Sequence, residues 1–342
     1  MILADKNNII SIFFNIAFIL FLGGCRQEGK KLIKISGEAQ GTTWHISYFA
    51  ETKTNDKPAI DSILKDIDKS LSTYLPASII SRINNNEPDA IPDQYFIDVY
   101  NKSVEISERT GGLFDVTVGP LVNAWGFGFT KKASVDAAKV DSLLEYVNYK
   151  MLSLENRKLV KEKPEITVDF NAIAQGYSVD VLADYLESKG ITNYLVEIGG
   201  EVKARGKKNN ENWKVGIDQP NEEKSAERKL QVLIDLNNRA LATSGNYRNF
   251  YVEDGKKYAH ILDPKTGYPA KQNILSATVL AEDGMTADAY ATAFMVMGLE
   301  QSKKFLTENK DLKLEVFFIY DNNGNWKTYS SESLKNHIKE LN

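Results

Sequence analysis

The sequence is poor in the residues that form cross-links and metal sites, with one cysteine and three histidines in 342 residues. The cysteine, Cys25, lies near the N-terminus, so the rest of the chain can form no disulfide even in an oxidising compartment. A structural zinc site needs several Cys or His ligands, which this composition disfavours. We therefore expect a hydrophobic core, without disulfides or zinc, to hold the fold together.

Several common signatures are also missing. There is no Gly-x-Gly-x-x-Gly, no Gly-x-x-x-x-Gly-Lys-Ser/Thr and no Gly-x-Ser-x-Gly, which argues against ordinary dinucleotide-binding, P-loop and α/β-hydrolase folds. The chain has 42 basic and 46 acidic residues, and this balance does not favour a nucleic-acid partner. The densest basic run, residues 203–208, is expected to be the solvated end of a β-hairpin.

The longest apolar run covers residues 9–22. It is shorter than the ~20 residues that a membrane-spanning helix needs, and it leads into a Leu-Gly-Gly-Cys sequence that resembles the bacterial lipoprotein cleavage box. We expect residues 1–24 to be a signal peptide, Cys25 to carry a lipid, and residues 25–31 to be a short tether. An ordinary signal peptide with an incidental cysteine is the alternative. Lipidation would anchor the protein to a membrane of the bacterial cell envelope, facing the periplasm.

Beyond this segment, strand and helix patterns alternate without a strict βαβ order. Apolar residues at helical spacing predict helices over 58–73, from Pro92 to Gly111, and over 135–149, 173–188, 286–297 and 301–308. Alternating or β-branched segments predict strands within 31–49, 151–160, 165–170, 191–280 and 314–320, the last one being buried. This mixture favours an α+β fold with a largely antiparallel or mixed sheet. No repeat or linker interrupts it, so residues 32–342 are expected to form one composite domain.

Asp288 and Thr292 are a candidate metal site. They lie one turn apart on the helix predicted over 286–297, so their side chains share a face. Both offer hard oxygen atoms, which suit Mg²⁺. The structural alternative is that Asp288 complements the helix dipole in the first turn and that Thr292 bonds to the backbone of its own helix.

The turn-rich segment 258–269 is a candidate functional loop, because it is polar and lies between β-rich sequences. Its His260 is the natural proton carrier, although a lone histidine in a β segment is often a core residue. Residues 168–177 pass from a strand through a polar turn into a helix, whose free N–H groups would attract phosphate. The alternative is that Asp169 or Asn171 simply caps that helix.

Residues 111–128 alternate glycines with aromatic residues in a predicted loop of ~20 residues. Such a loop can turn sharply and lie against a planar ring, or it can be a structural corner around the buried Trp125. Gly199, Gly200 and Glu201 are interpreted first as a hairpin turn and second as a close approach to a ligand.

Taken in order, these segments resemble the FAD:protein FMN transferase family, often called the ApbE family. The matching pieces are residues 41–44, 72–74, 112–121 with 125–128, 169–180, 199–201, 242–248, 260–269 and 288–292. The resemblance implies an α+β fold with an FAD cleft between two lobes. It also implies Mg²⁺-dependent transfer of FMN from FAD to a Thr or Ser hydroxyl of an acceptor flavoprotein, with release of AMP. With water as acceptor the same site would be an FAD pyrophosphatase, and a non-catalytic FAD-binding lipoprotein is the remaining alternative.

The resemblance also implies roles for particular residues. Asp288, Thr292 and the backbone carbonyl of Ala172 would ligate the metal, and His260 would be the catalytic base alongside Asp288. The residues implied to line FAD are Gln40, Tyr74, Leu113, Phe114, Asp115, Asp169, Gln175 and Ile261. Acceptors typical of the family are subunits of membrane electron-transport complexes.

Two positions depart from the family pattern. Gln40 stands where the family often has Met, and Gln175 stands where it often has Lys. Without that lysine a positive charge near the diphosphate is missing. FAD affinity would then rest more on Mg²⁺ and on backbone N–H groups.

Overall fold

The structure, a computed structural model, describes residues 30–52, 55–128, 135–219, 229–246, 250–253, 256–259 and 261–341. Of residues 250–253 and 256–259 only the backbone is described. Cys25, the expected signal peptide and His260 therefore lie outside the described residues. In the described part of the chain, no helix combines the length and the apolar character needed to span a membrane.

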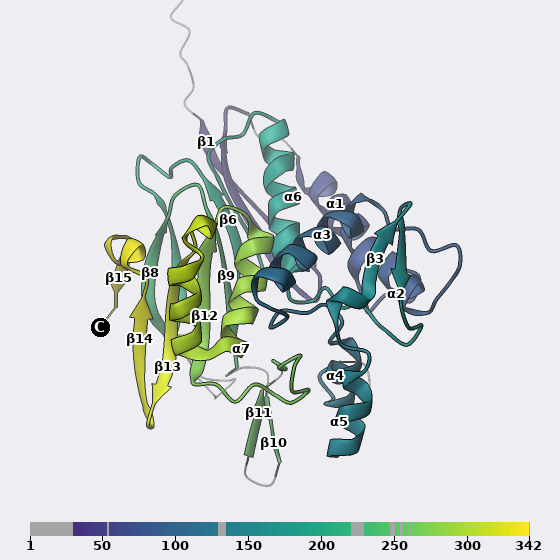
Figure 1. Ribbon diagram of the computed structural model, residues 1–342. Helices are drawn as coiled ribbons and strands as arrows, with labels where there is room; N and C mark the ends of the chain where they lie inside the picture. Colours follow the sequence, from purple (N-terminus) through teal and green to yellow (C-terminus); the bar gives the residue numbers. More distant parts are fainter. Residues whose placement is uncertain are drawn as a thin grey trace, which may run out of the picture.

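An eight-stranded sheet forms the centre of the molecule (Figure 1). Its strands lie side by side in the order β1 (Lys31–Ala39), β2 (Thr42–Ala50), β5 (Tyr194–Ile198), β6 (Glu201–Arg205), β9 (Ala240–Gly245), β12 (Ile274–Ala281), β13 (Glu315–Asn322) and β14 (Asn325–Ser330). All neighbouring pairs in this sheet are antiparallel. The expected α+β class with a largely antiparallel sheet is confirmed.

Successive residues of the central strands pack on opposite faces of this sheet. In β9, Ala240 and Ala242 join the core under the helices, whereas Leu241 between them joins a separate core on the other face. That second face is covered by a three-stranded sheet of β7 (Trp213–Asp218), β8 (Leu230–Leu236) and β15 (Ile338–Glu340). Because both faces are buried, β13 carries apolar residues on both sides, with Val316 and Phe318 in one core and Phe317 and Ile319 in the other.

Helices cover the first face (Figure 1). The long helix α7 (Gly284–Glu308) packs on β9 and β12, and α6 (Ala174–Ser188) packs beside it. Helix α3 (Gln94–Arg109) contacts α7, α1 (Lys57–Leu71) contacts α3 and α6, and α2 (Ile79–Asn84) contacts α1. The short helices α4 (Gly119–Ala124) and α5 (Ala137–Leu144) share a small core that includes Leu262. The backbone also forms the hairpins β3–β4 (Leu152–Glu155, Lys158–Lys161) and β10–β11 (Phe250–Glu253, Lys256–Ala259).

Two strand predictions were wrong. Residues 151–160 contribute to the hairpin β3–β4 instead of one strand, because Asn156 and Arg157 adopt left-handed φ angles of 49° and 62° that turn the chain. Residues 165–170 form no strand, and Asp169 donates its backbone N–H to the Val116 carbonyl instead. The predicted last strand, 314–320, corresponds to β13, but β14 and β15 follow it.

Two helix predictions and one loop prediction also need correction. The helix expected over 135–149 ends at Leu144. The one expected from Pro92 begins at Gln94, with the Asp93 side chain accepting the Phe96 N–H as its cap. The loop predicted over 111–128 contains α4, whose first turn holds a proline, as helix starts often do.

Candidate functional site

A cavity of about 1120 Å³ opens where segments far apart in the sequence come together. Its wall includes the start of β2, the residues before and within the first turn of α6, the β5–β6 turn and the inner face of α7. Residues 113–118 and 126–127 form another part of the wall, and residues 261–264 a third. Turns and helix starts thus surround a space large enough for a small molecule.

Most of the predicted site residues meet in this cavity. Tyr74, Leu113, Phe114, Asp115, Asp169, Ala172, Gln175, Ile261, Asp288 and Thr292 all line it. Gln40 does not: its Nε2 donates to Ser178 Oγ at 2.7 Å, and Thr42 and Thr43 of the same hairpin line the cavity in its place. His260 lies outside the described residues, although its neighbour Ile261 is on the cavity wall.

Asp288 is held at the contact between α6 and α7. Its side chain is 7% exposed, and its Oδ2 accepts the Gly176 N–H at 3.0 Å. The two helices approach so closely here that a Cβ on Gly176 would lie 2.2 Å from the Gly284 carbonyl oxygen. Burial raises the pKa of Asp288 to about 7. The structural alternative for this residue fails, because Asp283 is the residue that caps α7.

Thr292 lies one turn further along α7 and also faces the cavity. Its Oγ1 is 3.0 Å from Ser244 Oγ on β9. The hydroxyl therefore contacts the neighbouring strand and is not engaged with the backbone of its own helix. This leaves two hydroxyls and the Asp288 carboxylate on one side of the cavity.

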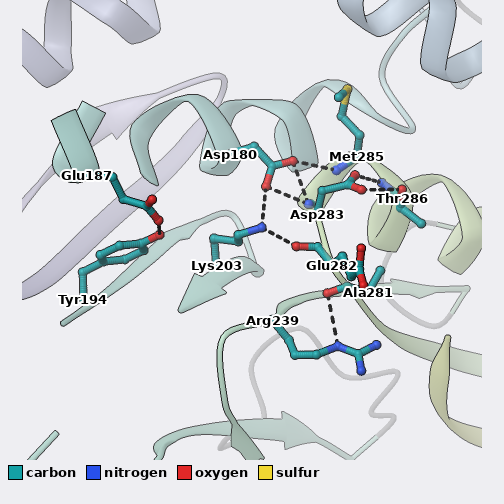
Figure 2. A network of polar contacts seen from close by, with 11 residues as sticks. Asp180, Glu187, Tyr194, Lys203, Arg239, Ala281, Glu282, Asp283, Met285 and Thr286 are labelled. Carbon is teal, nitrogen blue, oxygen red and sulfur yellow. Dashed lines mark hydrogen bonds and ion pairs between the residues drawn. The ribbon is translucent and has the colours of Figure 1, made fainter. Parts of the chain in front are cut away.

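A polar cluster fixes the start of α7 relative to α6 and β6 (Figure 2). Asp180 accepts the backbone N–H groups of Gly284 at 2.7 Å and Met285 at 3.1 Å, and Lys203 Nζ lies 3.3 Å from its Oδ1. Lys203 also donates to the Glu282 carbonyl. Burial raises the pKa of Asp180 to about 6, although Lys203 opposes the rise. The expectation that residues 203–208 form a solvated hairpin end was wrong at Lys203.

Glu201 is a buried acid that the sequence analysis included in the segment 199–201 but to which it gave no chemical role. The β5–β6 turn at Gly199 and Gly200 is confirmed, and Glu201 follows it on the cavity wall, 8% exposed. Burial, reinforced by the negative charge of Asp288, raises the pKa of Glu201 well above its usual value. An acidic residue directly after a Gly-Gly turn, at the start of an otherwise apolar strand, was the signal available in the sequence.

Two other acids mainly order the cavity wall. Asp115 accepts from the Thr117 N–H and hydroxyl at 2.8 Å and 2.6 Å, and from the Tyr149 N–H at 2.9 Å. Asp169 accepts the Asn171 N–H at 2.8 Å and does not cap α6, which begins without a side-chain cap. Burial raises the pKa of both carboxyls. Both therefore shape the turns that border the cavity.

Trp125 joins two parts of the wall. Its Nε1 donates to the Gly267 carbonyl at 2.8 Å, and its ring centroid lies 5.7 Å from that of Tyr268. The glycine-rich segment is thus a structural corner around a buried tryptophan, and its residues Gly126 and Phe127 also line the cavity. The structural interpretation is confirmed, and contact of this segment with a planar ring stays a prediction.

The charges around the cavity are of one sign. Its described lining includes Asp115, Asp169, Glu197, Glu201, Asp218 and Asp288, and it contains no lysine or arginine. Nowhere in the described chain do three His, Cys, Asp or Glu side chains form a metal-binding group. Mg²⁺ commonly binds through one or two carboxylates, with water and substrate phosphates completing its coordination. Asp288, with hydroxyl and carbonyl oxygens nearby, fits such an ion.

Comparison with known proteins identifies close relatives. The model of the ApbE family matches residues 40–318. The FAD:protein FMN transferase of Vibrio cholerae is 37% identical over 332 residues, covering 94% of this chain and 96% of that protein. The enzyme of the same name from Haemophilus influenzae is 36% identical over 343 residues, covering 96% of this chain and 97% of the relative.

Solved structures agree with this similarity. The flavin transferase ApbE from Vibrio cholerae superposes with a TM-score of 0.80 and 34% identity, over 90% of this chain and 99% of that one. The ApbE protein from Thermotoga maritima gives a TM-score of 0.79 and 28% identity, over 91% of this chain and 100% of that one. The likeness thus extends over nearly the whole described fold.

Proposed function

This chain belongs to the ApbE family, and we propose that it is an FAD:protein FMN transferase, which moves the FMN half of FAD onto a Thr or Ser hydroxyl of an acceptor flavoprotein and releases AMP. One observation carries the proposal: Asp288 and Thr292 share one face of α7 on the wall of a cavity of about 1120 Å³. Small-molecule sites usually measure roughly 300–1000 Å³. A site at or above the top of this range is suited to a dinucleotide.

We assign the cavity lining to FAD. Tyr74, Leu113, Phe114 and Ile261 offer aromatic and aliphatic surface for the rings. In the first turn of α6, the Ala174 and Gly176 N–H groups already donate to the Phe170 carbonyl and to Asp288, so we assign the Gln175 N–H, which no described hydrogen bond uses, to the diphosphate. Gln175 lies at that helix start, where it can donate hydrogen bonds but adds no charge. Gln40 would not contact FAD directly but would support the cavity wall through its hydrogen bond to Ser178 on α6.

We assign Mg²⁺ to the oxygens of Asp288, Thr292 and the Ala172 carbonyl. The absence of lysine and arginine from the described lining supports this, since a diphosphate among six acids needs a positive charge. Bound there, Mg²⁺ would offset the charge that develops on the phosphate oxygens. The Gly176 N–H holds Asp288 in place for this role.

Transfer requires a base near the acceptor hydroxyl. We propose that His260 takes the hydroxyl proton as that oxygen bonds to the FMN phosphorus, while the anhydride bond to AMP breaks and AMP leaves with the bridging oxygen. His260 precedes Ile261, which lines the cavity, and this position in the chain supports the assignment.

The location of the protein is part of the proposal. Residues 1–24 would be removed as a signal peptide, and a lipid on Cys25 would anchor residues 32–342, as one domain, to the periplasm-facing side of a membrane. The apolar run and the Leu-Gly-Gly-Cys sequence support this. A subunit of a membrane electron-transport complex, exposed on the same side, would then be the acceptor.

The test combines the protein with FAD, MgCl₂ and a candidate acceptor flavoprotein, followed by a denaturing gel. We expect a fluorescent acceptor band, and a rate that falls by more than about 100-fold in Asp288→Asn, because even residues that only orient metal ligands contribute about 10- to 100-fold. Asp311→Asn, which breaks an exposed ion pair with Arg109, is the control and should keep the rate.

Other outcomes would overturn the proposal. Release of FMN and AMP without a labelled band would make the protein an FAD pyrophosphatase. If FAD stays intact, FAD binding without catalysis would be the remaining function. A rate unchanged in Asp288→Asn would remove the assigned metal site.

A further inference from the structure

Glu201 combines burial with a side-chain oxygen that has no partner. Its residue is 8% exposed, and its Oε2 is buried without a hydrogen bond in the described structure. Buried polar atoms nearly always have a partner, so an exception needs a physical explanation such as an ion or an ordered water. Because Glu201 lines the main cavity, that partner can enter from the cavity.

The neighbouring Glu197 shows what a satisfied carboxylate looks like at the same place. It lines the same cavity from β5, but its Oε2 lies 2.8 Å from His45 Nδ1 and its Oε1 accepts the Gly200 N–H at 2.9 Å. Among the described residues, the Oε2 atom of Glu201, on the adjacent strand β6, has no such partner. The two glutamates therefore differ in that both side-chain oxygens of Glu197 have a partner, whereas Oε2 of Glu201 has none.

Glu201 and Asp288 face the same space from different elements. β6 and α7 are packed together, and both residues line the cavity, which has no described lysine or arginine on its wall. Two buried carboxylates without a positive partner are costly. A divalent cation lowers that cost for both, and Mg²⁺ keeps several water ligands that need acceptors around it.

We infer that Glu201 is a positioning residue for the divalent cation: the free oxygen of Glu201 would accept a hydrogen bond from a water ligand of the ion. The inference rests on the metal site of the proposed function and extends it to a residue on the sheet. Asp288 would hold the ion directly, and Glu201 would fix where its water shell lies. The positions of the cation and of its water ligands would then be set by two elements of the fold, α7 and β6.

The test measures cation binding without turnover. Mn²⁺ is titrated into the protein, alone and with ADP as a source of diphosphate, and free Mn²⁺ is followed by electron paramagnetic resonance. We expect Glu201→Gln, which keeps the shape and removes the charge, to weaken Mn²⁺ binding by about 10- to 100-fold, the usual effect of residues that orient metal ligands. Asp311→Asn, which removes a carboxylate from an exposed ion pair outside the cavity lining, is the control and should change binding less than about twofold.

Stability separates this role from a structural one. Glu201→Gln removes a buried carboxyl group whose charged form has no partner, so its melting temperature without metal should equal or exceed that of the unsubstituted protein. Glu201→Asp, which retains the charge but shortens the side chain, should give intermediate Mn²⁺ affinity.

Two results would overturn the inference, and they are distinguishable. If Glu201→Gln binds Mn²⁺ like the unsubstituted protein while Asp288→Asn does not bind, Glu201 has no role at the cation and the proposed metal site stands. If the unsubstituted protein itself binds no Mn²⁺, with or without ADP, the metal site of the proposed function fails as well.

Discussion

At the scale of single residues, the site depends on two positions where only glycine fits. Gly176 and Gly284 let α6 and α7 approach until the Gly176 N–H reaches Asp288. Neither glycine has a left-handed backbone, so close packing is the reason for glycine here. The position of Asp288 therefore depends on the lack of a side chain at Gly176 as well as on the hydrogen bond of its own carboxylate.

Gly176→Ala should therefore damage both stability and transfer. The new Cβ would lie 2.2 Å from the Gly284 carbonyl oxygen, and overpacking of this kind costs typically about 1–3 kcal/mol. We expect urea unfolding to show a loss of this size, and the transfer rate to fall because Asp288 moves with α7. Gly190→Ala is the control: its left-handed φ of 76° makes it strained, but no atom lies within 4 Å, so it should lose stability and keep transfer. A Gly176→Ala protein with normal stability and rate would refute this account of the contact.

At the scale of elements, the Asp180 cluster joins α6, β6 and the start of α7 (Figure 2). The carboxylate complements the helix dipole of α7 and accepts two of its free N–H groups. Lys203 supplies the opposite charge from the sheet. The helix that carries Asp288 and Thr292 is thus fixed by a residue outside the cavity.

This cluster gives a pH dependence with a defined sign. The folded protein raises the pKa of Asp180 from 3.8 to about 6, so the native state holds this proton more tightly than the unfolded state does. Its stabilising contribution is complete below about pH 3.8 and is lost as the pH rises through 6.

Asp180→Asn removes this titration while keeping an acceptor oxygen. The stability of the variant relative to the unsubstituted protein should rise by about 1–3 kcal/mol between pH 4 and pH 7, at 1.36 kcal/mol per pKa unit. Urea midpoints and slopes at several pH values measure this difference. Asp311→Asn at an exposed ion pair should show a difference nearly independent of pH, and the same flat profile for Asp180→Asn would contradict the prediction.

At the scale of the whole molecule, the cavity draws its walls from nearly the full length of the chain, from Thr42 to Val296. Binding of a ligand that fills the cavity should therefore raise the free energy of unfolding of the whole protein. Because the described lining is acidic, FAD and a divalent cation should stabilise the fold together more than the sum of each alone.

Thermal unfolding tests this coupling. FAD with MgCl₂, each at about 100 times its dissociation constant, should raise the melting temperature by roughly 5 °C, since saturation at that level contributes about 2.7 kcal/mol. FAD with EDTA should give a clearly smaller shift, and Asp288→Asn should lose the part that depends on Mg²⁺. Equal shifts with MgCl₂ and with EDTA would show that the cation does not help to hold the dinucleotide.

Some features of the protein followed from the sequence alone. The spacing of Ile60, Leu64 and Ile67 places one buried face on α1, and the same local rule located α3, α6 and α7. The ordered motifs also located most of the cavity lining, because each motif is a short turn or helix start whose shape depends on its own residues, but they did not locate residues 215–218 on β7. Helix positions and short turns depend on residues close together in the sequence, so the pattern of the sequence can predict them.

The tertiary structure alone decided the rest. Gly176 and Asp288 are 112 residues apart, and no local pattern shows that one would donate to the other. Lys203 was expected in solvent because its neighbours are basic, yet Asp180 lies across from it on another element. Glu201 follows an ordinary turn. Only the packing of β6 against α7 places its carboxylate at the cavity wall, where Oε2 has no hydrogen-bond partner in the described structure. Burial and charge depend on what lies across space, and long-range packing sets both.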